Sequence, residues 1–135
     1  MKILKDTNSM IAFLARDEYR FRPGYRKEYY WHHLKQQELT AAQKHRLQNI
    51  ALNYLQQRMR REFWYMCRCL QPIADEGFRQ QVWQLTNSPD GAISKRASLL
   101  NEYLKGAEKG EEERKKFKME CRDQKYKHLF GAIYT

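Results

Sequence analysis

Hydrophobic residues recur every three or four positions over most of the chain, which is the spacing of one helix face. The best-defined stripe consists of Leu47, Ile50, Tyr54, Met59, Phe63, Met66 and Leu70. Thr40 and Gln43 have the spacing of a capping box, and no helix breaker follows until Pro72. We therefore predict one long helix over 41–70. The stripe drifts around the helical wheel, so such a helix must bend or change its packing partner midway.

Four shorter helices are expected around this element. One begins after the cap-like run 6–9, one spans about 25–37, and one follows Pro72. The fourth opens at 88–89, where serine and proline suit the N-cap and the first turn, and Gly106 ends it. Their inward faces are predicted to be Met10, Phe13 and Leu14; Tyr30 and Leu34; Phe78, Val82 and Leu85; and Ile93, Ala97, Leu100 and Leu104.

The segment after Gly106 differs from the rest because charged residues dominate it. Glutamates and lysines four positions apart support a helix there, each pair contributing about 0.3–0.5 kcal/mol. Apolar residues are few until Leu129 and Phe130. We therefore expect a helical bundle domain over 1–106. Residues 107–135 are expected to form a charged C-terminal helix with an apolar tail, separable from the core and able to act as a docking segment.

Composition agrees with this helical pattern. Only three prolines and six glycines occur in 135 residues, and 41% hydrophobic with 31% charged content is typical of a globular chain. The length allows a buried core without disulfides or metals. The predicted fold class is all-α: a compact helical bundle of about five helices around one long central helix, with a charged C-terminal helix.

The charge balance indicates acidic partners. The formal net charge is +10, and its excess is concentrated in residues 40–72, with six basic residues against one acidic. Residues 73–106 are neutral, and the segment from Ala107 has eight basic against six acidic residues. A basic patch of this kind favours nucleic acid, an anionic membrane surface or an acidic protein as a partner.

Aromatic and basic residues alternate in a second informative region, 19–31, which holds six aromatics and four basic residues. Rings can stack on bases while arginine and lysine neutralise phosphates. The candidate binding residues in it are Arg20, Phe21, Arg22, Arg26 and Lys27. The alternative is a structural loop, in which the rings close one end of the bundle and the arginine stems lie over them.

The predicted long helix carries a further candidate surface. Arg61, Trp64 and Arg68 are spaced to share one helical face, and Arg60 lies one turn before Trp64. If the stripe through Phe63 is core, this face points outward, and an exposed tryptophan among arginines is typical of a binding hot spot. The alternative is that the second helix or the C-terminal segment covers Trp64.

Catalytic and metal-binding patterns are missing from the sequence. No paired-carboxylate, glycine-rich phosphate loop, nucleophile elbow or zinc-protease pattern occurs. Cys67 and Cys69 lie two apart, so on a helix they point away from each other and are poorly placed to share an ion with His32 and His33. A helix-turn-helix over 75–105 is conceivable, but this region is neutral, which favours an ordinary helix pair. We expect no enzyme activity, no cofactor, no metal and no small-molecule substrate.

These observations predict a non-catalytic basic protein that binds nucleic acid, with single strands preferred because stacking needs an exposed base. The alternative is a protein–protein interaction adaptor that binds an acidic partner through the same surface. Three cysteines without framework spacing and an N-terminus without a signal-peptide pattern predict a cytoplasmic location. No apolar run has membrane-spanning length, so no membrane association is expected.

Overall fold

The computed structural model describes residues 6–17 and 23–122, and this part of the chain is helical without strands. Its seven α-helices are α1 (Thr7–Arg16), α2 (Pro23–Lys35), α3 (Ala41–Leu55), α4 (Phe63–Leu70), α5 (Glu76–Leu85), α6 (Gly91–Lys105) and α7 (Ala107–Arg122). A short 3₁₀ turn over Gln71–Ile73 follows α4. The predicted all-α class is confirmed, and the bundle has more helices than the sequence indicated.

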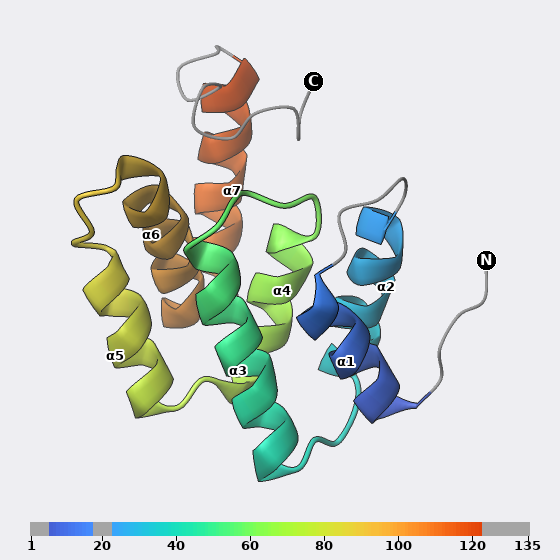
Figure 1. Ribbon diagram of the computed structural model, residues 1–135. Coiled ribbons are helices and arrows are strands. Elements are labelled where there is room, and N and C mark those ends of the chain that lie inside the picture. The colour runs from blue at the N-terminus through green and yellow to red at the C-terminus, as the bar shows by residue number, and fades with distance from the viewer. Residues whose placement is uncertain (1–5, 18–22, 123–135) are drawn as a thin grey trace.

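Helices α3 and α4 lie in the middle of the molecule (Figure 1). Helices α1 and α2 cover one side of this pair, whereas α5 and α6 cover the other, and α7 packs along α6. The inward stripes predicted for the short helices supply much of the core, with Met10, Phe13, Leu14, Tyr30, Leu34, Phe78, Val82, Ala97, Leu100 and Leu104 all buried. None of the helices in the described ranges has the length and apolar character to cross a membrane.

The predicted long helix over 41–70 is wrong. Its start is correct, because Thr40 and Gln43 form the expected capping box. The helix nevertheless ends at Leu55, and residues 56–62 form two turns joined by an irregular stretch before α4 begins. Arg96 of α6 donates from Nε to the backbone carbonyl of Leu55 at 2.8 Å, which satisfies an acceptor that a continuing helix would have used.

The drift of the hydrophobic stripe was the signal of this break. The Tyr54 half of the stripe packs with α1, whereas the Phe63 half packs with α2 and α6. A straight helix would turn only one of these halves toward the core. The chain therefore changes partners by breaking rather than by bending.

The start of α6 also differs from the prediction. Asp90 caps this helix, because its Oδ1 accepts from the backbone N–H groups of Ala92 and Ile93 at 2.9 and 3.2 Å. Ser88, the expected cap, instead accepts from the backbone N–H of Asp90. The negative charge of an aspartate at this position is also stabilised by the positive end of the helix dipole.

Helix α7 packs into the same core as the other helices up to Arg122. Phe117 is buried, and Gly110 lies directly against the ring of Tyr103, so closely that a Cβ at this position would overlap it. Whether the segment from Ala107 can be separated from the core stays a prediction. The remainder of the predicted docking segment, 123–135, lies outside the described residues.

Candidate functional site

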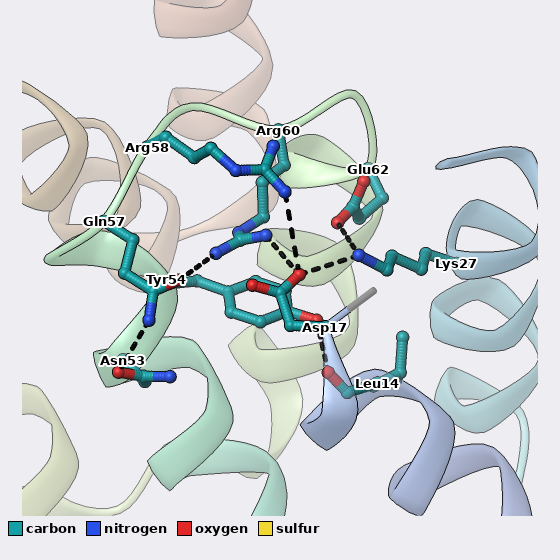
Figure 2. A network of polar contacts seen from close by, with 9 residues as sticks. All are labelled: Leu14, Asp17, Lys27, Asn53, Tyr54, Gln57, Arg58, Arg60 and Glu62. Atoms are coloured by element: carbon teal, nitrogen blue, oxygen red, sulfur yellow. Dashed lines mark hydrogen bonds and ion pairs between the residues drawn. The ribbon is translucent and has the colours of Figure 1, made fainter. Parts of the chain in front are cut away.

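Asp17 organises a network of cations between α1, α2 and the connection from α3 to α4 (Figure 2). It ends α1 in a left-handed conformation, with φ 50° and ψ 48°. Its Oδ1 accepts from Lys27 Nζ at 2.7 Å and from Arg60 Nη1, and Arg58 Nη2 lies 3.9 Å away. Three cations therefore share one carboxylate, and Glu62 lies 4.0 Å from Lys27 as a second counter-charge.

Two of the predicted binding residues, Lys27 and Arg60, are buried in this network. The Arg60 side chain is 1% exposed, and its guanidinium lies 3.7 Å from the centre of the Tyr54 ring. Burial lowers the pKa of Arg60, although the Asp17 carboxylate opposes this shift. The Tyr54 hydroxyl in turn donates to the Leu14 carbonyl at 2.6 Å. Basic and aromatic side chains therefore connect α1, α2 and α3 here. Lys27 and Arg60 are both buried, so neither is at the protein surface where a ligand was expected to bind.

Trp64 lies in the core, so its predicted surface position is wrong. It is 4% exposed, and its ring meets Phe63 edge-on at 5.0 Å and Phe117 of α7 at 5.8 Å. Coverage by the C-terminal segment was the alternative expected from the sequence. The reason is that α4 has neighbours on several sides, with α2 against one and α6 against another.

Arg68 is held at the junction of α4, α6 and α7. Its Nη2 lies 3.1 Å from Glu111 Oε1, and its Nε donates to the Tyr103 hydroxyl at 3.2 Å. That hydroxyl donates to Glu111 Oε2 at 2.7 Å. Partial burial would raise the pKa of Glu111, but the hydrogen bonds from Tyr103 and Arg68 hold it below its usual value. Arg68 remains partly exposed, so this group is accessible from solvent.

The outer side of α2 keeps aromatic side chains at the surface, and Arg61 from the connection before α4 lies against one of them. Tyr25 is 52% exposed, and the Arg61 guanidinium lies 3.8 Å from the centre of its ring. Arg61 is itself half-exposed and pairs through Nε with Glu28 at 3.0 Å. One turn further along, Tyr29 stacks on His33 with ring centres 5.7 Å apart and planes 7° apart.

This surface continues from α2 onto α4. His32 meets the edge of the Tyr65 ring at 6.3 Å, and the Arg68 guanidinium lies 5.3 Å from the centre of that ring. We call the combined surface the α2–α4 face, consisting of Tyr25, Tyr29, His32, His33, Arg61, Tyr65 and Arg68. It brings together two of the predicted site residues, Arg61 and Arg68.

The other predicted residues lie elsewhere or are not described. Arg26 is directed toward α1, where its guanidinium lies 4.4 Å from the centre of the Phe13 ring and its Nη2 donates to the Tyr30 hydroxyl. Arg20, Phe21 and Arg22 fall in the range 18–22, outside the described residues.

A separate hollow between α5 and α6 was not predicted. It has a volume of about 360 Å³ and is lined by Glu76, Arg79, Gln80, Trp83, Asn101, Leu104 and Lys105. Trp83 is 57% exposed at this hollow. The signal was present in the sequence, because the stripe through Phe78 and Val82 leaves Trp83 off the buried face of the same helix.

The cysteines of the described chain are free thiols, and two of them are buried. Burial raises the pKa of Cys67 well above its ordinary value and that of Cys69 to about 12. Both stay protonated at neutral pH, and a protonated thiol is a poor nucleophile and metal ligand. Within 6–17 and 23–122, no group of three His, Cys, Asp or Glu side chains is placed to hold a metal ion.

The comparisons with known proteins found no relative. No protein-family model, no curated protein and no solved structure matches this chain. Its function must therefore be inferred from its own surface chemistry.

Proposed function

We propose that this protein binds single-stranded nucleic acid without catalysis, through the α2–α4 face. The observation that carries the proposal is the exposed pair of Arg61 and Tyr25 beside the stacked pair of Tyr29 and His33. Exposed rings next to cations are the chemistry of single-strand recognition, because rings stack on bases and cations contact phosphates. The net charge of +10 would favour the approach of any polyanion.

The ion pairs on this face do not block such a ligand. Arg61 pairs with Glu28 and Arg68 with Glu111, but all four side chains are partly exposed. Exposed ion pairs contribute about 0–1 kcal/mol, so exchanging a carboxylate for a phosphate costs little. The buried pairs around Asp17 differ in this respect, since two of their cations have almost no contact with solvent.

The test is binding of fluorescent oligo(dT) and oligo(U) of about 12 nucleotides, followed by anisotropy over a series of salt concentrations. Tyr25→Ala and Tyr29→Ala should each weaken binding by about 1–3 kcal/mol with little change in salt dependence, because stacking releases no counterions. Arg61→Gln should instead lower the salt slope by about one unit. A duplex of equal length should bind more weakly.

Trp83→Ala is the matched control, because it removes an equally exposed aromatic ring from a different face. It should leave oligonucleotide affinity unchanged. Absence of binding by the wild-type protein at moderate salt would contradict the proposal, as would equal losses in the Tyr25 and Trp83 variants.

The second candidate function is an adaptor that binds an acidic partner protein. The specific observation in its favour is the hollow at Trp83, because an exposed tryptophan beside Arg79 and Lys105 is a typical interaction hot spot. Tyr25→Ala and Trp83→Ala distinguish nucleic-acid binding from the adaptor function. Loss of an acidic protein partner in Trp83→Ala, with no oligonucleotide binding by the wild type, would favour the adaptor.

A further inference from the structure

The charges of α7 are nearly balanced in sequence but divide into two stripes on the helix. At about 100° per residue, Arg114, Lys115, Lys118 and Arg122 fall on one side together with two acids, Glu108 and Glu111. Glu113 and Glu120 fall on the opposite side, where Glu120 meets Lys95 of α6 at 3.5 Å and Glu113 pairs with Lys116. The acidic stripe therefore already has partners, whereas the basic stripe has an excess of charge.

The basic stripe meets α4 at Arg68. Arg68 Nη2 and Arg114 Nη1 lie 3.1 and 3.9 Å from the same atom, Glu111 Oε1. Lys118 lies one turn beyond Arg114, and its pKa is lowered by partial burial and then by the charges of Arg114 and Arg68. Among the described residues, these three cations thus converge on the Glu111 carboxylate, and all three are partly exposed.

We propose that Arg68, Arg114 and Lys118, which we call the α7 strip, bind phosphates of the strand whose bases stack on the α2–α4 face. This inference rests on the proposed function and extends its binding site from α2 to α7. Arg68 belongs to both surfaces, since it lies over the Tyr65 ring and pairs with Glu111. The rings of α2 and the cations of α7 therefore border the same stretch of α4.

A phosphate is a better ligand for these three cations than another carboxylate of the chain. An arginine fork can donate two parallel hydrogen bonds to a phosphate, and a strand brings one negative charge per nucleotide. A phosphate between Arg114 and Lys118 would also relieve the repulsion between the two cations. The gain is electrostatic, so it must appear in the salt dependence of binding.

The experiment uses the full chain and oligo(dT) of about 12 nucleotides. Arg114→Gln and Lys118→Gln should each lower the salt slope by about one unit, whereas the matched control Lys116→Gln should not. Lys116 lies on the same helix and is also a lysine, but it belongs to the other stripe. Denaturant unfolding of each variant verifies that the bundle is intact.

A second measurement follows the wild-type Lys118 side chain by NMR titration with and without the oligonucleotide. A bound phosphate should raise the pKa of Lys118, because an opposite charge favours the ammonium form. Unchanged slopes and an unchanged Lys118 titration, in a protein whose binding still depends on Tyr25, would overturn this inference alone. If the wild-type protein does not bind the oligonucleotide at all, both this inference and the proposed function are overturned.

Discussion

Arg60 and Arg61 are neighbours in sequence, and each contacts a tyrosine ring, but one arginine is buried and the other is exposed. Each guanidinium lies over a tyrosine ring, at 3.7 Å from the centre of Tyr54 and 3.8 Å from that of Tyr25. The Arg60 side chain is 1% exposed, whereas that of Arg61 is 49% exposed. An arginine–tyrosine contact therefore does not by itself indicate either a binding surface or a core.

The counter-charges explain the difference. Arg60 is surrounded by Asp17 and Glu62 together with two further cations, an arrangement that lets a guanidinium remain charged out of water. Within the described part of the chain, the ion pair of Arg61 is with Glu28, and both side chains stay in contact with solvent. A buried cation needs several fixed partners, so it serves the fold, whereas a cation with one weak partner can exchange it for a ligand.

The largest predicted effect separates these two arginines. Arg60→Ala should lower the free energy of unfolding by about 3 kcal/mol, because it breaks a buried ion pair and removes the packing over Tyr54. Arg61→Ala should change it by no more than about 0.5 kcal/mol, since that side chain is exposed. Urea denaturation of both variants measures the difference. Equal effects would mean that burial does not distinguish the two contacts.

Arg68 lies between these extremes, because its contacts depend on how α7 is seated. Gly110→Ala should push the Tyr103 ring aside and with it the hydroxyl that bonds Arg68 and Glu111. We expect a loss of about 1–3 kcal/mol in the free energy of unfolding, the usual cost of overpacking. The matched control is Gly77→Ala in α5, where a methyl group has room and replaces a flexible helical residue.

That control should leave stability unchanged or slightly raised, as measured by thermal and denaturant unfolding. If Gly110→Ala were equally harmless, α7 would not be fixed against Tyr103. Such a result would favour the separable C-terminal segment that the sequence predicts.

The sequence predicted well those features that depend on nearby residues. The capping box at Thr40 and the end of α6 at Gly106 both follow from side chains within a turn of the feature. The break after Leu55 could not be located, because its cause includes Arg96, which lies forty-one positions later. Hydrophobic spacing alone showed that the helix must change partners, but not where.

The candidate site followed the same rule. Arg61 was assigned correctly to the surface, because its side chain stays about half exposed among the described residues. Trp64 was not, because Phe117 of α7 lies over it, and Arg60 was not, because Asp17 at the end of α1 draws it inward. Trp83 could have been found, since the buried stripe of α5 alone places it outward. Long-range burial is the information that one sequence pattern lacks.

The smallest predicted effect concerns pH and the two carboxylates that serve these arginines. Burial raises the pKa of Glu62, although Lys27 opposes the shift, so the folded protein holds this proton more tightly than the unfolded chain does. Stability from Glu62 is therefore present at low pH and is lost as the pH rises above about 4.5 through the raised pKa. Relative to Glu62→Gln, the wild type should lose free energy of unfolding as the pH rises above about 4.5.

Glu28→Gln is the matched comparison at the exposed arginine. Partial burial also raises the pKa of Glu28 against the effect of Arg61, so the same sign is expected. Its dependence should be weaker, because Glu28 is more exposed to solvent than Glu62. Denaturant unfolding across this pH range measures both differences. The opposite result would be a stability of the wild type, relative to Glu62→Gln, that grows with pH. It would mean that the attraction between Glu62 and Lys27 outweighs the cost of burying Glu62. The charges of the Asp17 network would then stabilise the fold by more than their desolvation costs.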